Sequence, residues 1–296
     1  MTAKLIKHSA SSVNGKEILT FELVYPRIVH SEFLTHRLFS RNAASSRAIP
    51  IDKLIGLIEE DCAMPAEWGL NQAGMVAKGT HPDTLGCKIT WLKGARRALK
   101  STRELQAKNL HKQICNRPLE TYQYIKTIVT ATEWDNWYWL RNHEAADPTI
   151  RLLAQEMWAA KEASTPQVLE PGEYHLPYIN LEDFDIITLE EAIKISTSCC
   201  AQVSYRNLDA SIEKALKIHE NLTSMDRIHA SPMEHVATPM KETVIGVRSL
   251  LPWAGDLNEG EHIDWKGNIW SGNFMGWSQY RQTVPNNTCW ELPEEE

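Results

Sequence analysis

The sequence lacks the features that would assign it to several large classes of protein. No stretch approaches the roughly 18 consecutive apolar residues that a membrane-spanning helix requires, so we expect no membrane partner. Residues 1–19 have no apolar core followed by a small-residue cleavage site, which argues against a secretory signal. Neither the Gly-x-Gly-x-x-Gly pattern of Rossmann folds nor a Walker phosphate loop occurs. Any redox cofactor is therefore expected in a pocket of another type.

Paired cysteines and a surplus of basic residues are missing as well. The six cysteines are scattered without a Cys-x-x-Cys pair, so reduced thiols in the cytoplasm are expected rather than disulfides or a zinc ribbon. Cys199 and Cys200 lie among small residues with no evident activating base, which favours burial over nucleophilic chemistry. The net charge of -7 argues against nucleic acid as a partner, because such proteins normally carry a basic surplus.

Tryptophan, in contrast, is abundant, with eleven in 296 residues. Large aromatic side chains build cores and line pockets for flat ligands. With 43% hydrophobic and 23% charged residues, the composition is that of a globular protein long enough to bury a large core.

The apolar pattern predicts an α+β fold, mostly helical, with few strands; the family resemblance described below implies that these form a small antiparallel sheet. Residues 18–25 alternate apolar and polar as a half-buried strand does. A loop is expected over 41–50, and residues 63–86, rich in Gly, Pro, Asn and Thr, are predicted to form an ordered excursion or lid. Helices are predicted over 28–37, 51–62, 88–110, 121–142, 148–162, 188–198 and 209–222. A capping box of Thr188 and Glu191 marks the start of one of them.

A group of basic and hydroxyl residues is the first that could carry chemistry. It comprises residues 35–37, 40–42 and 45–47, with three arginines and a histidine. Arginine forks and loop N–H groups suit phosphate, and hydroxyls suit the edge of a base or a flavin. A solvated basic turn would explain the same residues equally well.

A second group is the segment 229–235, His-Ala-Ser-Pro-Met-Glu-His. His229, Glu234 and His235 could indicate a metal site, but a proline interrupts the helix that would align them, and the spacing is not His-Glu-x-x-His. We therefore predict no metal and favour a hydrogen-bonded turn that presents His229 and Ser231 to a ligand.

A third group lies on the predicted helix around residue 137. Asn136 and Arg141 are about one and a half helical turns apart and are interleaved with Trp137 and Trp139. Aromatic residues in such a pattern belong to the core more often than to a ligand pocket.

Together these groups resemble motifs of the flavin-dependent thymidylate synthases. Thr35-His36-Arg37, seven further residues, and then Ser45 and Arg47 match the family's Arg-His-Arg signature, except that Thr35 replaces its first arginine. The segment Ala-Thr-Glu-Trp-Asp-Asn-Trp-Tyr-Trp-Leu-Arg is similar to the family's helix in which an asparagine precedes a substrate-binding arginine by five positions.

Two more matches occur in an unexpected order. Residues 200–205 resemble the family's Ala-Arg-Val-Ser segment, and residues 229–235 resemble its His-x-Ser/Thr-Pro-x-Glu-His turn. Both precede the Arg-His-Arg motif in ordinary members, and both follow it here. Residues 273–281 look like an echo of the helix that leads into that motif. The layout resembles long, often phage-encoded members, which would place the protein in the host cytoplasm.

The order of the motifs implies two pseudo-related halves, produced by permutation or by duplication. We predict one half at 1–165 and the other at 178–296, with a Pro-containing linker at 166–177. Residues 51–109 have no counterpart that we can place in the family.

The resemblance implies chemistry without a cysteine nucleophile. In the family, NADPH reduces FAD, a one-carbon unit from methylenetetrahydrofolate passes through the flavin to C5 of dUMP, and flavin hydride completes the methyl group. The family's catalytic residues map to His36, Arg37 and Arg141. Its FAD contacts map to His36, Arg37, Asn42, Asn136, Ser204, His229, Ser231 and Glu234. Its nucleotide contacts map to Glu32, Ser45, Ser46, Arg47 and Arg141.

Departures from the family pattern leave the substrate open. Glu32 stands where glutamine is usual, and Asp147 replaces another amide-bearing position after Arg141. An ionised carboxylate accepts but cannot donate a hydrogen bond, so it would favour the amino group of cytosine over the carbonyl of uracil. Methylation of dCMP, or a hydroxymethyl product, is therefore an alternative to thymidylate synthesis. An inactive nucleotide-binding protein is a third possibility, because Thr35 weakens the first motif.

Ordinary family members are homotetramers whose sites are shared between subunits. For this chain we expect a homo-oligomer, a dimer or a tetramer, with a pyrimidine deoxynucleoside monophosphate and folate as small-molecule partners.

Overall fold

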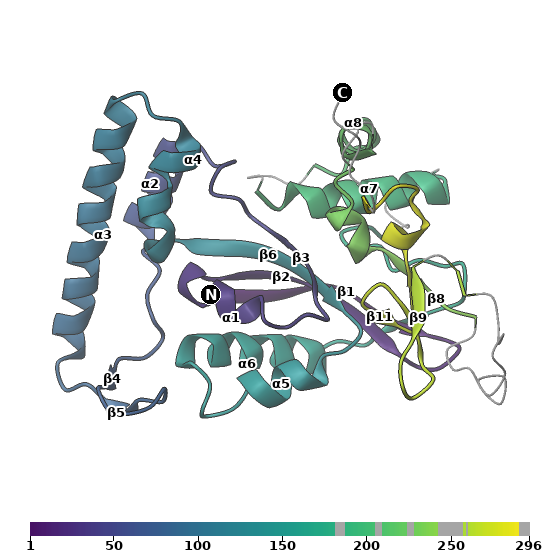
Figure 1. The fold of residues 1–296 in the computed structure, drawn as a ribbon, viewed down its shortest axis with the longest axis horizontal. Coiled ribbons are helices and arrows are strands. Elements are labelled where there is room, and N and C mark those ends of the chain that lie inside the picture. Colours follow the sequence, from purple (N-terminus) through teal and green to yellow (C-terminus); the bar gives the residue numbers. More distant parts are fainter. Residues whose placement is uncertain (181–186, 205–208, 224–227, 242–256, 259, 290–296) are drawn as a thin grey trace.

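A five-stranded sheet in the order β3-β6-β2-β1-β7 forms the centre of the molecule (Figure 1). The strands are β1 (Thr2–Ser11), β2 (Glu17–Pro26), β3 (Ser40–Ala43), β6 (Tyr124–Ala131) and β7 (Gln167–Leu169). Neighbouring strands are antiparallel except β1 and β7, which are parallel. The structure, a computed structural model, describes all residues except 181–186, 205–208, 224–227, 242–256, 259, 290–296 and the side chain of Ser204.

Strand β2 lies within the sheet and has buried side chains on both faces. Successive side chains of a strand point to opposite faces. Leu19, Phe21 and Tyr25 belong to a hydrophobic cluster on one face. On the opposite face Ile18 packs with Trp277 and other residues, most of them from the C-terminal part of the chain.

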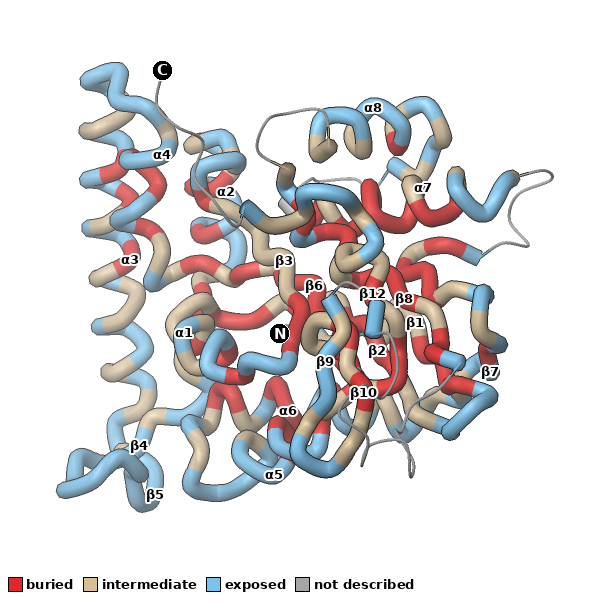
Figure 2. Tube along the Cα trace, turned by 45° about the vertical axis from the view of Figure 1, so that its right-hand side comes forward, coloured by how far each residue is buried: buried red, intermediate tan, exposed pale blue. Residues whose placement is uncertain are grey.

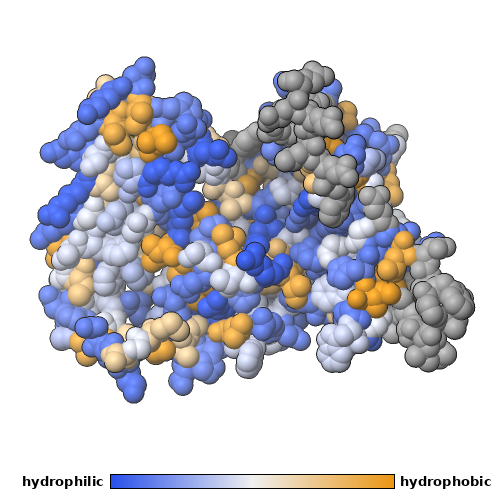
Figure 3. Space-filling view, viewed as in Figure 1, coloured by the Kyte–Doolittle hydropathy of each residue, from blue (hydrophilic) through white to orange (hydrophobic). Residues whose placement is uncertain are grey.

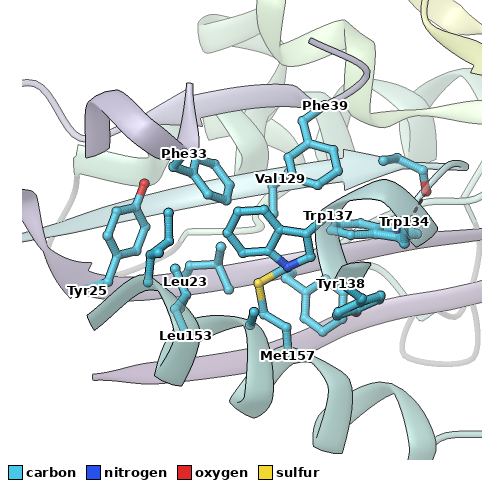
Figure 4. Close-up of a cluster of buried hydrophobic side chains, with 14 of the residues drawn as sticks. Leu23, Tyr25, Phe33, Phe39, Val129, Trp134, Trp137, Tyr138, Leu153 and Met157 are labelled. Carbon is cyan, nitrogen blue, oxygen red and sulfur yellow. Dashed lines mark hydrogen bonds between the residues drawn. The ribbon is translucent and has the colours of Figure 1, made fainter. Parts of the chain in front are cut away.

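The first of these clusters holds several helical elements against the sheet. Trp137 lies at its centre, surrounded by Phe33, Phe39, Trp134 and Met157 (Figure 4). The ring of Trp137 meets that of Phe33 edge-on, with centroids 5.3 Å apart. Burial of each side chain of this size contributes about 2–3 kcal/mol. The elements it joins to the sheet are η1 (Arg27–Val29), α1 (His30–Phe33), α5 (Asp135–Arg141) and α6 (Pro148–Glu162).

The C-terminal part of the chain covers the other face. Its elements are α7 (Leu189–Ala201), η4 (Gln202–Ser204), α8 (Ile212–Thr223), η5 (Ser231–His235), β8 (Ala237–Pro239), β9 (Glu261–Ile263), β10 (Ile269–Ser271), β11 (Phe274–Met275), β12 (Trp277–Gln279) and η7 (Tyr280–Thr283). Burial is concentrated in the central strands and along α7 (Figure 2).

A chain of buried hydrogen bonds joins this part to the sheet. His235 Nδ1 lies 2.8 Å from the Thr130 hydroxyl, which lies 2.6 Å from that of Thr20. His175 bridges Thr20 and Ser9 through its two ring nitrogens, at 2.8 and 2.9 Å. Because all five residues are buried, each polar group needs the hydrogen bond to its neighbour in this series. The series therefore fixes the position of the C-terminal part on the sheet.

A helical arm extends from the sheet on the side away from α7 (Figure 1). Its elements are α2 (Ile51–Glu60), β4 (Gly69–Leu70), β5 (Lys78–Thr80), α3 (Thr84–Ala107), α4 (Lys112–Cys115) and η2 (Arg117–Tyr122). The arm has its own core around Leu54, Leu99 and Leu119. The segment before the β4–β5 hairpin is tied to α6 by an ion pair between Glu67 and Arg151 at 2.9 Å.

Several sequence-based expectations for the elements are wrong. The helix predicted over 121–142 is strand β6 followed by the short α5. Strand β6 is buried on both faces, so its apolar residues do not alternate and its period resembles a helix segment. The helix predicted over 28–37 ends at Phe33, and the loop predicted over 41–50 begins as strand β3.

Other expectations are confirmed. The mixed α+β class and the helix over 148–162 agree with the structure. The capping box is present, with the Thr188 hydroxyl accepting from the Glu191 amide at 3.2 Å. The division into two halves with a linker at 166–177 stays a prediction; this segment contains β7, which joins the central sheet beside β1.

The described part of the face seen in Figure 3 is mainly hydrophilic, and its hydrophobic residues form separate patches. None of the described helices combines the length and the hydrophobicity needed to cross a bilayer.

Candidate active site

The tight turn between α1 and β3, residues 34–39, is fixed at both ends by the core. Phe33 and Phe39 are both buried, and their rings lie 5.6 Å apart in the cluster around Trp137. The amide of His36 donates to the carbonyl of Phe33, and that of Phe39 donates to the carbonyl of His36. The turn therefore holds the Thr35-His36-Arg37 motif on a rigid base.

His36 is a sheltered, neutral imidazole. Its ring is 7% exposed and meets the Trp137 ring edge-on at 4.8 Å. Arg141 Nε donates to His36 Nε2 over 3.0 Å. Burial, helped by the charges of Arg141 and Arg41, lowers the His36 pKa to about 4. At neutral pH, Nε2 accepts this hydrogen bond and the ring proton is on Nδ1.

Arg141 connects His36 to the first of two hollows. Its Nη2 donates to the Thr35 hydroxyl at 3.1 Å, and its Nη1 lies 3.7 Å from the Glu32 carboxylate. Burial and the nearby Asp147 carboxylate raise the pKa of Glu32, against the opposing effect of Arg141. Arg141 is thus a partly paired cation at a site that also holds a carboxylate of raised pKa.

The first hollow, which we call the Arg141 cavity, has a volume of about 1030 Å³. Arg141 and Glu32 form one wall, the α5–α6 connection with Asp147 forms another, and the β4–β5 hairpin with Lys78 forms the third. The hairpin belongs to the arm, so the arm contributes directly to this cavity.

The second hollow, the His229 cavity, lies between β3, η4 and η5 and has a volume of about 370 Å³. Asn42, His229 and Ser231 line it together with Arg41. Asn42 also donates to the carbonyl of Cys200, at 3.5 Å. The structure thus brings together three predicted cofactor contacts from segments almost two hundred positions apart in the sequence.

The turn at His36 separates these hollows. The His36 ring is directed to Arg141 on one side, whereas its carbonyl accepts from Arg41 on the other, at 3.1 Å. The imidazole of His36 is not among the groups that line the His229 cavity. The side chains of His36 and His229, both predicted as FAD contacts, therefore do not line one common cavity in the described part of the structure.

Residues of the C-terminal part of the chain hold the same turn through side-chain hydrogen bonds. Asn273 Nδ2 donates to the carbonyl of Leu38 at 2.9 Å, and its side-chain oxygen accepts from the Ser40 hydroxyl at 3.0 Å. The buried Gln279 donates to the Asn273 side chain at 2.9 Å and to the carbonyl of Glu234 at 3.3 Å. One hydrogen-bonded group thus fixes the turn, η5 and β12 relative to each other.

The remaining predicted residues lie in varied surroundings. Arg37, Arg47 and Asn136 are exposed, and Ser45 is half-buried. Ser46 is buried and donates to Glu120 at 3.0 Å, which gives it a contact inside the arm. The side chain of Ser204 is outside the described part of the structure.

The segment 229–235 directs its ionisable groups to different places. His229 faces its cavity, Glu234 pairs with Arg281, and His235 bonds to Thr130. Burial lowers the pKa of His235 to about 3, so it is neutral. Among the residues that the structure describes, no group of three or more His, Cys, Asp or Glu is placed to hold a metal ion.

Sequence reasoning gave no role to Arg41, Asn273, Gln279 or Arg281. Arg41 lies inside the motif and was counted as one of its basic residues. The other three fall in the segment that resembles the helix before the motif, and that resemblance was the one signal for them.

Arginine side chains suit anionic and planar ligands, and a hollow with a few polar groups is a typical place for a small ligand. The comparison with protein families agrees. The model of the family described as thymidylate synthase complementing protein matches residues 1–167. The chain therefore belongs to this family, that of the flavin-dependent thymidylate synthases, and is an enzyme of the one-carbon transferase type.

Solved structures with a related arrangement include two of the UMP/dUMP methylase PolB from Streptomyces cacaoi. The one bound with 5-Br dUMP has a TM-score of 0.45 and 16% identity, covering 55% of this chain and 90% of that chain. The one bound with 5-Br UMP has a TM-score of 0.46 and 16% identity, covering 55% and 88%. No curated protein matches the chain.

Proposed function

We propose that the protein methylates C5 of dUMP to form dTMP, with FAD as cofactor and with methylenetetrahydrofolate and NADPH as co-substrates. The observation that carries the proposal is the His36 turn, because it places the family motif between two polar hollows in a chain that belongs to this family. FAD, when bound, supplies the hydride and the transfer of the one-carbon unit.

The His229 cavity fits part of a flavin nucleotide. The Asn42 amide, the Ser231 hydroxyl and the His229 ring offer hydrogen bonds, and Arg41 offers a positive charge. Apolar contact comes from Val203 and from the neighbouring α8. In our proposal these residues hold and orient the cofactor. Arg37 and Asn136, whose side chains are exposed, are proposed as further flavin contacts.

The Arg141 cavity is proposed as the nucleotide site. Arg141 is held by His36 and Thr35, so its remaining donors are positioned before the substrate arrives. Arg141 faces the pyrimidine and Lys78 adds a second cation to the cavity. Ser45 and Arg47 are proposed to contact the sugar or phosphate.

A second candidate, dCMP as substrate, is favoured by one observation. Glu32 and Asp147 both line the Arg141 cavity, and ionised carboxylates accept hydrogen bonds from the amino group of cytosine. The raised pKa of Glu32 points the other way, because a protonated carboxyl donates to the carbonyl of uracil. A hydroxymethyl product belongs to this second candidate.

The test is product analysis by mass spectrometry. Purified protein is incubated with FAD, NADPH, methylenetetrahydrofolate and either dUMP or dCMP. We expect dTMP, formed only with FAD present and lost in Arg141→Met, whereas Arg103→Gln, an exposed arginine of α3, keeps full activity. A methylated or hydroxymethylated cytosine product would replace the first proposal by the second. No flavin-dependent product from either nucleotide would refute both.

We also propose a homo-oligomer, because Arg37 and Arg47 are exposed in this chain, and a second copy packed over them would enclose the ligands that they are proposed to contact. Light scattering of active enzyme tests this, and an active monomer would contradict it.

A further inference from the structure

Arg41 is a cation that its own fold uses only in part. Its Nη1 donates to the carbonyls of Leu34 and His36, at 3.0 and 3.1 Å. Its Nε and Nη2 make no hydrogen bond to any residue that the structure describes. The guanidinium is half-buried and lines the His229 cavity, so these unused donors are at the wall of a hollow.

Among the residues that the structure describes, positive charge prevails around the cavity. Glu234, the carboxylate that acts on Arg41, forms an ion pair with Arg281, and Arg37 adds a further positive charge close to Arg41. This local positive charge contrasts with the net charge of -7 of the whole protein. A partly desolvated cation without a directly bonded carboxylate favours an anionic ligand.

The other polar side chains that line the cavity are those of Asn42, His229 and Ser231. The side chains of His229 and Ser231 are exposed and bond to none of the described residues, and the Asn42 amide makes one long bond. A guanidinium with further hydrogen-bonding side chains around it suits phosphate oxygens, to which arginine gives two parallel hydrogen bonds.

We infer that Arg41 is the phosphate-binding residue of the His229 cavity, a role that rests on the proposed function for its ligands. Under the proposed function the phosphate is that of the FAD pyrophosphate; it is that of the nucleotide substrate if dUMP occupies the His229 cavity instead of the Arg141 cavity. Arg41 also supplies a cation to the turn at Thr35, since its Nη1 bonds the carbonyls of the residues on either side. Its tether to the backbone means that the charge is in place before the ligand binds.

The inference predicts a loss of affinity that depends on phosphate. Charged hydrogen bonds of this kind correspond to roughly 10- to 100-fold in affinity. Arg41→Gln should therefore bind FAD or dUMP about 10- to 100-fold more weakly. Riboflavin and deoxyuridine, which lack phosphate, should bind as they do to the wild type. Arg41→Lys, which keeps the charge but loses the fork, should lie between.

The experiment measures binding of FAD, riboflavin, dUMP, deoxyuridine and inorganic pyrophosphate by isothermal titration calorimetry. Arg103→Gln is the matched control, and thermal melting shows whether each variant is folded. If Arg41→Gln does not fold, Arg41→Lys carries the test. A selective loss of FAD identifies the cofactor as the source of the phosphate, and a selective loss of dUMP identifies the substrate.

Two results would overturn the inference: unchanged affinity of the folded variant for every phosphate ligand, or an equal loss for riboflavin and deoxyuridine. A wild type that binds neither FAD nor dUMP refutes the proposed function instead. Inorganic pyrophosphate then still tests Arg41. The inference requires that pyrophosphate binds to the wild type and binds more weakly to Arg41→Gln.

Discussion

The hydrogen bond between Arg141 and His36 gives a prediction that can be worked out from the geometry. Arg141→Met removes both the donor, 3.0 Å from His36 Nε2, and the positive charge that opposes protonation of the ring. Neighbouring charges typically shift a pKa by about 1–3 units. Burial, which is the largest cause of the low His36 pKa, and the charge of Arg41 both remain.

We therefore expect the His36 pKa in Arg141→Met to rise by about 1–2 units from its value of about 4, which corresponds to about 1.4–2.7 kcal/mol. Arg141→Lys keeps the charge and should change the pKa by less than about half a unit. NMR titration of the histidine ring signals measures both, with His36→Gln to assign the resonance. A His36 that titrates near 6.5 in the wild type, or that has the same pKa in Arg141→Met, would refute this reasoning.

Three further predictions concern stability. Trp137→Ala should lower the free energy of unfolding, measured by urea titration, by about 3–5 kcal/mol. Trp139→Ala, on the same helix but 76% exposed, should change it by less than about 0.5 kcal/mol. Similar losses of unfolding free energy in the two variants would contradict the packing described. Gln279→Leu should cost about 2–4 kcal/mol, because it leaves buried partners in three segments unpaired, and a melting temperature equal to that of the wild type would argue against this network. The pKa values of His36 and His235, about 4 and about 3, lie below that of an unfolded histidine, so the unfolded state binds more protons than the folded state as the pH falls below 6.5. The free energy of unfolding should therefore decrease from pH 7 towards pH 4. A flat profile in that window would contradict the burial of these rings.

Local patterns in the sequence predict those parts of the fold that depend on neighbouring residues. The helix over 148–162 has a clear amphipathic period, and the Thr188 capping box specifies a helix start without help from the rest of the chain. Strand β6 fails this approach because both its faces are covered, by α5 and α6 on one side and by α7 on the other. Its burial depends on tertiary contacts that no window of sequence contains.

The site shows the same division. Motif spacing identified Asn42, His229 and Ser231, which the fold brings to one cavity. Motif spacing did not predict that the His36 ring is directed to Arg141 and away from that cavity. The orientation of this side chain depends on its packing against Trp137, which is a tertiary contact. The role of Gln279 was also missed, since its partners are spread over the chain.

A structure of the protein with FAD and dUMP tests the central claim most directly. The account predicts the flavin nucleotide in contact with Asn42, His229 and Ser231, and the pyrimidine beside Arg141 in the adjoining cavity. Flavin bound away from His229, or a nucleotide bound away from Arg141, would contradict it.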